Sequence, residues 1–333
     1  MYTILFANDL QVEISGENMK KKLIFLLVVL SVFLTACGGN GYTTEENEKL
    51  QVVTSFYPIY LLAQAVTEGA EGLELRNMAQ PQTGCLHDYE LTISDMKLLE
   101  KADVLIINGG GMEGFLEQAM ERYPELIVVD TSHGIALLEE EGHHHHEGET
   151  EEEHAAHSHA HEGNPHIWLS PERAAHQAEA IADALGELDA VDAAVLMENA
   201  EAFREAAEML QEKAHAIGIP EGECAAVFHE GFAYFAELFH MENVFGIFAD
   251  EYQMPSAREL TAAADEAKAH GIRFFLTAAD NGKVYAETIA AEVDEEVILL
   301  DPLTTEDEEG LSYLERMEKN VEMIENHWKE GTK

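Results

Sequence analysis

Short apolar runs alternate with segments of helically spaced apolar residues along most of the chain. The runs are rich in β-branched residues in the first half and recur after residue 218. The expected strands are residues 51–56, 73–79, 102–108, 126–130, 224–228, 243–248, 273–278 and 297–300, and the expected helices are 58–67, 92–101, 113–122, 231–240, 256–271, 283–292 and 311–329. Near-continuous apolar strands separated by helices are typical of parallel sheets covered on both faces. The pattern predicts an α/β protein with two lobes, each a parallel sheet flanked by helices.

One long helix is expected between the two sets of strands. Residues 191–217 contain neither Gly nor Pro, and their apolar side chains fall into one stripe. The stripe consists of Leu196, Phe203, Ala207, Leu210, Ala214 and Ile217. At about 1.5 Å per residue, such a helix would be roughly 40 Å long. We therefore predict an N-terminal lobe over 50–190, a connecting helix over 191–218 and a C-terminal lobe over 219–333.

The first 49 residues have the pattern of an export signal followed by a tether. Three lysines, Lys20 to Lys22, precede an apolar run from Leu23 to Leu34, and Cys37 follows shortly after. A basic segment before a short apolar run indicates secretion, and the run is short for a membrane span, which needs about 20 residues. The segment resembles a bacterial lipoprotein signal, in which such a cysteine is lipidated; a signal anchor is the alternative. We expect residues 1–36 to be an upstream extension and signal peptide, and 37–49 a polar tether.

Composition narrows the possible partners. The chain has 19 Lys and Arg against 65 Asp and Glu, a formal charge of −46. Nucleic acid is excluded as a partner because phosphate binding needs a basic face. The charge favours solubility and attracts cations. Three cysteines in a chain of 333 residues cannot form a disulfide framework.

Residues 139–162 form a low-complexity segment of Glu, Gly, Ala, Ser and His. Its histidines are His143, His144, His145, His146, His154, His157, His159 and His161. Histidine tracts bind metals, and imidazole suits zinc, copper and nickel. An expression tag is the alternative, but a tag is rarely internal or interleaved with glutamate. The segment predicts an auxiliary loop that collects or senses metal.

A second set of metal-ligating residues is dispersed along the chain. Its members are His87, His166, His229 and Asp301. Three of the four lie near the ends of expected strands, where open α/β sheets bind ligands. Three imidazoles and a carboxylate suit Zn²⁺. The spacing is no metal motif in itself, and Glu230 and Asp280 are alternatives for the last two positions.

The contexts of these residues resemble a known family. They are SFYPIY at 55–60, Gly84 to Thr92, NPHIWLSP at 164–171, FHEGFAYF at 228–235 and LLDPL at 299–303. In this order they are similar to the metal-binding receptor lipoproteins of bacterial ABC importers for zinc and manganese, the cluster A-I substrate-binding proteins. The likeness covers residues 50–329 and includes the histidine-rich loop of the zinc members. Two departures are Cys85-Leu86 before the first histidine, and Asn164 where the family commonly has Asp.

The resemblance implies a site and a function. His87, His166 and His229 match the three histidine ligands, and Asp301 matches the place of the C-terminal carboxylate, with Asp280 as the alternative. Histidine at the third position indicates zinc rather than manganese. The resemblance also implies two lobes, a nearly rigid connecting helix and metal bound between the lobes.

The expected protein is a non-enzymatic, monomeric zinc receptor. It would be lipid-anchored through Cys37 at the outer face of the cytoplasmic membrane, and it would deliver Zn²⁺ to a permease driven by an ATPase. The alternatives are a manganese receptor of the same class, a zinc hydrolase with Glu230 as general base, and an extracellular metal-buffering adhesin. The hydrolase lacks an HExxH signature in this sequence.

Overall fold

The computed structural model describes residues 49–79, 89–139, 163–246, 255–279 and 282–331, apart from the side chains of 117–118 and 243–246. These residues belong to one compact unit that begins at Lys49. Several predictions concern residues outside these ranges: the signal and tether, Cys37, Cys85, His87, the histidine-rich loop and Asp280. Within the described ranges, no helix combines the length and the apolar character that crossing a bilayer requires.

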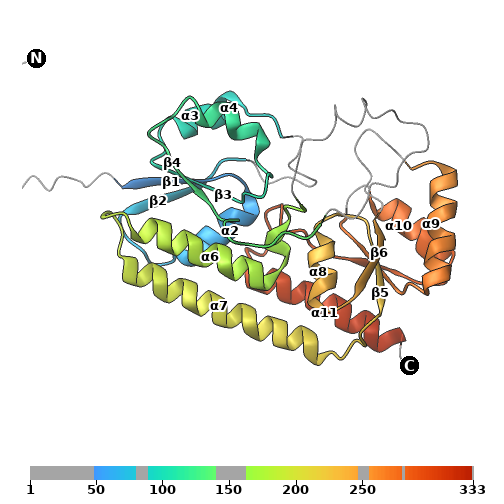
Figure 1. Ribbon diagram of the computed structural model, residues 1–333. Helices are drawn as coiled ribbons and strands as arrows, with labels where there is room; N and C mark the ends of the chain where they lie inside the picture. The colour runs from blue at the N-terminus through green and yellow to red at the C-terminus, as the bar shows by residue number, and fades with distance from the viewer. Residues whose placement is uncertain (1–48, 80–88, 140–162, 247–254, 280–281, 332–333) are drawn as a thin grey trace, which may run out of the picture. The chain divides into compact units, whose positions relative to one another are not determined.

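The first half of the described chain forms a four-stranded parallel sheet (Figure 1). Its strands are β1 (Leu50–Thr54), β2 (Leu73–Asn77), β3 (Val104–Ile107) and β4 (Ile127–Asp130), in the order β2-β1-β3-β4. Alternate residues of β1 and β3 pack on opposite faces, against α2 (Tyr57–Val66) and α6 (Pro171–Gly186) on one side and α3 (Ile93–Leu99) on the other. Burial on both faces explains why these strands read as continuous apolar runs.

The second half repeats this arrangement. Its strands are β5 (Cys224–Val227), β6 (Glu242–Gly246), β7 (Phe274–Thr277) and β8 (Val297–Leu299), all parallel, in the order β6-β5-β7-β8. The helices are α8 (Phe232–Leu238) and α11 (Tyr313–Gly331) on one face, with α9 (Ala257–His270) and α10 (Gly282–Ala291) on the other. The predicted fold class is confirmed: an α/β protein with two parallel sheets flanked by helices.

The long helix expected between the sheets is α7 (Ala193–Ala216), which packs beside α6 (Figure 1). Asp192 caps its N-terminus by accepting a hydrogen bond from the Ala194 amide. The predicted apolar stripe is buried from Leu196 to Ala214. One continuous core includes this stripe together with residues from both sheets, so the connection between the lobes is packed rather than hinged.

The helix expected over 113–122 is shorter than predicted. It divides into a 3₁₀ turn, η2 (Gly114–Leu116), and α4 (Glu117–Met120), and Glu113 lies before both. The buried Glu113 carboxylate accepts hydrogen bonds from Ser55 Oγ (2.7 Å), the Asn108 amide (2.7 Å) and the Gly109 amide (3.1 Å). Burial raises the pKa of Glu113 to about 7, although these three donors favour the carboxylate form. Glu113 therefore ties the ends of β1 and β3 together instead of starting a helix.

Candidate metal centre

His166 lies at the start of a 3₁₀ turn, η3 (Ile167–Leu169), which leads directly into α6. Its side chain is buried, with the residue only 1% exposed. The preceding peptide is anchored from the first sheet, because Asn108 Nδ2 donates to the Pro165 carbonyl at 2.9 Å. The His166 ring packs against Trp168 with the ring centres 5.0 Å apart. The position of this imidazole is therefore determined by β3, η3 and an aromatic neighbour.

Asn164 sets the orientation of the His166 ring. Asn164 Nδ2 donates to the Glu230 carbonyl at 2.9 Å, which leaves Oδ1 facing His166. That oxygen accepts from the His166 amide at 3.0 Å and lies 2.9 Å from His166 Nδ1. An acceptor at Nδ1 keeps the proton there and directs the lone pair of the neutral ring to Nε2. His166 thus has the tautomer that a metal ligand needs.

His229 follows the carboxyl end of β5, two residues after the strand ends. Its ring packs against Phe232 at the start of α8, with centres 5.3 Å apart. The Gly231 amide donates to His229 Nδ1 at 3.2 Å, so Nδ1 is an acceptor in this arrangement. A metal at Nε2 requires the other tautomer, and binding there would exchange the Gly231 contact for a metal bond.

The structure brings His166 and His229 together, although they are 63 positions apart in the sequence. Their ring centres are 5.1 Å apart and the ring planes meet at 77°. Two imidazoles bound to one tetrahedral zinc at 2.0–2.1 Å have ring centres about 5 Å apart. The separation therefore fits two ligands of a shared ion.

The rest of the predicted site is not assembled within the described residues. There, no group of three or more His, Cys, Asp or Glu side chains converges as a metal site. His87 and the alternative ligand Asp280 lie outside the described ranges. Glu230 Oε2 is 4.0 Å from His166 Nδ1, on the ring edge that faces Asn164, so Glu230 lies beside the candidate ligand and not at its Nε2.

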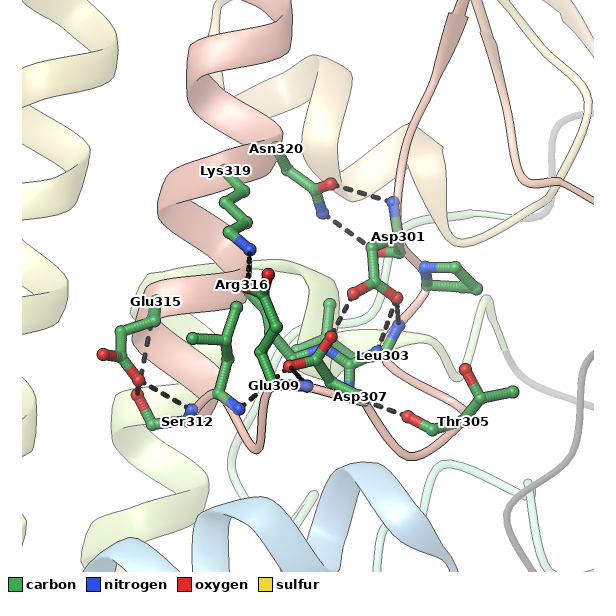
Figure 2. Close-up of polar contacts among 12 residues, drawn as sticks. Asp301, Leu303, Thr305, Asp307, Glu309, Ser312, Glu315, Arg316, Lys319 and Asn320 are labelled. Atoms are coloured by element: carbon green, nitrogen blue, oxygen red, sulfur yellow. Dashed lines mark hydrogen bonds and ion pairs between the residues drawn. The ribbon is translucent and has the colours of Figure 1, made fainter.

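Asp301 does not join the two histidines, and its contacts argue against the role of zinc ligand predicted from the sequence. Arg316 Nε donates to Oδ2 at 2.6 Å and Arg316 Nη2 to Oδ1 at 2.7 Å (Figure 2). The Leu303 amide also donates to Oδ1, at 2.8 Å. A bidentate pair with a guanidinium occupies a lone pair on each carboxylate oxygen and therefore competes with a metal for this group. In the structure Asp301 is a partner of Arg316, and its role as a zinc ligand stays a prediction.

The Asp301 pair has a structural role near the histidines. Arg316 is almost fully buried and also donates to the Thr305 carbonyl at 2.8 Å, while Asn320 bonds the Asp301 backbone (Figure 2). These contacts hold the loop after β8 against α11. Trp168 Nε1 donates to the Pro302 carbonyl of the same loop at 3.0 Å. The loop therefore supports the aromatic ring on which His166 packs.

Replacing Asn164 by Ala is expected to weaken zinc binding by about 10- to 100-fold, as for other groups that orient a histidine ligand. The variant loses the acceptor at His166 Nδ1 and the link to the Glu230 carbonyl. Competition with a chromophoric zinc chelator measures the affinity. Asn164→Asp is the matched control, because it keeps the acceptor and should bind at least as tightly as the natural chain. Equal weakening in both variants would contradict the orienting role.

The sequence predicts His166 and His229 as ligands, but it does not predict the groups that support them. Asn164 departs from a family pattern, and its position two residues before a histidine is the available signal for its role. No local signal in the sequence indicates the hydrogen bond from Asn108 to Pro165 or the ion pair of Asp301 with Arg316. The partners are 57 and 15 positions apart.

The fold and the paired imidazoles define a class. Two parallel-sheet lobes share one core, and a histidine from each side of the junction contributes to the pair, as the sequence resemblance to metal-binding substrate-binding proteins leads one to expect. The family model described as "Zinc-uptake complex component A periplasmic" matches residues 52–327. The chain belongs to this family.

Individual relatives agree with this membership. The chain is 28% identical over 319 residues to the zinc-binding lipoprotein AdcA of Streptococcus pneumoniae, covering 92% of this chain and 60% of the relative. It is 27% identical over 327 residues to the high-affinity zinc uptake system protein ZnuA of Bacillus subtilis, covering 92% of this chain and 98% of the relative. The chain thus spans about three-fifths of the AdcA relatives and nearly all of ZnuA.

Solved structures show the same fold. A crystal structure of a Zn(II)-bound variant of AdcAII from Streptococcus pneumoniae matches with a TM-score of 0.67 and 26% identity, covering 84% of this chain and 99% of that protein. The sequence-based resemblance to this family is confirmed by the family match, and the predicted fold class by the structural match.

Proposed function

We propose that this protein is the extracytoplasmic receptor of a zinc importer, which captures Zn²⁺ and delivers it to an ABC permease driven by an ATPase. The observation that carries the proposal is the His166–His229 pair, whose ring separation of 5.1 Å suits a shared zinc ion. The names of the relatives, zinc-binding lipoprotein and zinc uptake protein, support the same metal. Manganese prefers oxygen ligands, so a site led by imidazoles favours zinc.

The ligand set we propose is His87, His166, His229 and Asp280. The order of the strands supports Asp280 over Asp301. β5, which leads to His229, pairs with β7, which ends at Thr277 shortly before Asp280. Adjacent strands are about 4.8 Å apart, whereas β8, which leads to Asp301, is a further strand away. The gap between β5 and β7 is also where the strand order reverses, the usual ligand position in open α/β sheets.

The remaining assignments extend the family's role to this chain. We propose that Cys37 is acylated and anchors the protein to the outer face of the cytoplasmic membrane, where the chain acts as a monomer. Residues 139–162 would act as an auxiliary loop that concentrates zinc near the site, since histidine tracts bind metal and the adjacent glutamates attract cations. The proposed lobes and tether keep the boundaries predicted from the sequence.

The test is calorimetric zinc titration of the chain with and without residues 140–162. The loop can be removed cleanly, because Leu138 and Asn164 form an antiparallel bridge and the Asn164 amide donates to the Leu138 carbonyl at 2.8 Å. Joining Glu139 to Gly163 then makes a two-residue hairpin connection, a favoured length. We expect one tight site to remain and the weaker sites of the loop to disappear. Loss of all zinc binding would refute the proposed receptor site.

A further inference from the structure

Two histidines outside both predicted metal-ligating sets lie against each other on the surface. His215 is in the last turn of α7, and His240 follows the end of α8. Their rings are 4.7 Å apart between centres and nearly parallel, with an angle of 25° between the planes. Both residues are exposed, so the contact is not a product of core packing. The tertiary structure therefore creates a pair of imidazoles that the sequence does not reveal.

The backbone at His240 has an unusual conformation for a residue with a side chain. Its φ of 57° is in the left-handed region, at the position after the C-cap of α8, where glycine is the usual residue. The His240 amide donates to the Glu237 carbonyl and the Met241 amide to the Ala236 carbonyl, which is the hydrogen-bonding pattern of a Schellman motif. Glycine would satisfy this position with less strain. The imidazole at this position is thus retained at a conformational cost.

The electrostatic surroundings favour a cation at this pair. His215 and His240 lie at the C-terminal ends of α7 and α8, where the carbonyl groups carry partial negative charge. The chain as a whole has a formal charge of −46. A bound divalent ion would be attracted by both, since a net negative protein raises the local concentration of cations.

We propose that His215 and His240 form a second, surface metal site for a divalent transition ion such as Zn²⁺. The ring separation of 4.7 Å is close to the distance of about 5 Å for two imidazoles that share an ion. The stacked rings do not both face one point as they stand, so the proposed site requires both exposed rings to rotate about χ2 until one nitrogen of each faces the ion, with water completing the coordination. Imidazole ligands suit zinc, copper and nickel. With two protein ligands, the site binds more weakly than the His166–His229 centre and exchanges with solvent.

Histidine-selective acylation, read out by mass spectrometry of the His215 and His240 peptides, tests the site in the whole chain. ZnCl₂ beyond the first equivalent should slow modification of both rings several-fold. The variant His240→Gly removes one ligand while suiting the left-handed backbone, so it should fold at least as stably. In this variant, modification of His215 should no longer depend on zinc.

His270 is the matched control. It is exposed in the last turn of α9, directly before Gly271 in the left-handed conformation, and no ring contact to a second imidazole is found there among the described residues. Its rate of modification should not change with zinc. If zinc protects His215 equally in His240→Gly, or protects neither ring in the natural chain, the two residues are only helix-terminal side chains and the proposal fails. Zinc should still protect His215 and His240 in the variant His229→Ala. The result for this surface pair is then independent of the result for the proposed receptor site.

Discussion

Replacing His229 by Ala is expected to lower the affinity of the tight zinc site by more than about 100-fold, beyond the effect of losing an orienting group. The variant removes one of the two imidazoles whose ring centres are 5.1 Å apart. Only His166, His87 and Asp280 of the proposed ligand set remain in this variant, and a closed zinc site takes about four protein ligands. Competition with a chromophoric chelator measures the loss, in the variant that lacks 140–162 so that loop histidines do not contribute.

The control for this prediction is His176→Ala. His176 is an exposed residue of α6 whose ring is 3.8 Å from Glu179, and it takes no part in the His166–His229 pair. Its removal should leave the affinity unchanged. Urea titration of both variants should give similar midpoints, since His229 is only partly buried. Unchanged zinc affinity in His229→Ala would exclude it as a ligand.

The second large effect is expected on the free energy of unfolding and not on the affinity for zinc. Asp301→Asn should lower the free energy of unfolding by about 2–4 kcal/mol, because it leaves the buried Arg316 guanidinium without its carboxylate partner. The value is toward the lower part of the range for buried pairs, since the Asp301 side chain is 36% exposed and partly solvated. A fall in the urea midpoint measures the loss.

Asp280→Asn is the matched comparison. It should lower zinc affinity and leave the urea midpoint near that of the natural chain, the reverse of the result for Asp301→Asn. Asp265→Asn, at an exposed position on α9, controls for loss of a surface charge and should change neither. If Asp301→Asn abolished tight zinc binding in the folded protein while Asp280→Asn did not, Asp301 and not Asp280 would be the carboxylate ligand.

Much of the fold could be predicted because its signals are local. Each strand of the two sheets lies within or beside a run of apolar residues, and the stripe from Leu196 to Ala214 is buried as its helical spacing indicates. The helix expected from Glu113 was too long because its carboxylate is recruited by Ser55, a residue 58 positions away. Propensity within a segment contains no information about such a partner.

Prediction of the site depended on the same distinction. His166 and His229 are predicted as ligands because their neighbours in the sequence resemble known receptors, and the structure places the two rings in contact. Asp301 has an equally suggestive sequence context, yet its carboxylate pairs with Arg316 from α11. A short motif identifies a residue type at the end of a strand, but it does not show which other side chain contacts that residue in the folded protein.

By itself, the sequence determined most element types and the two-sheet α/β class, and it predicted His166 and His229 as candidate ligands, because periodicity and short motifs are properties of neighbouring residues. Only the tertiary structure decided the strand order, the hydrogen bond from Asn164 to the Glu230 carbonyl, the pairing of Asp301 with Arg316 and the contact of His215 with His240. Each of these depends on which distant segments pack together. Packing is set by burial and hydrogen bonding across the whole chain, and a local pattern does not encode it.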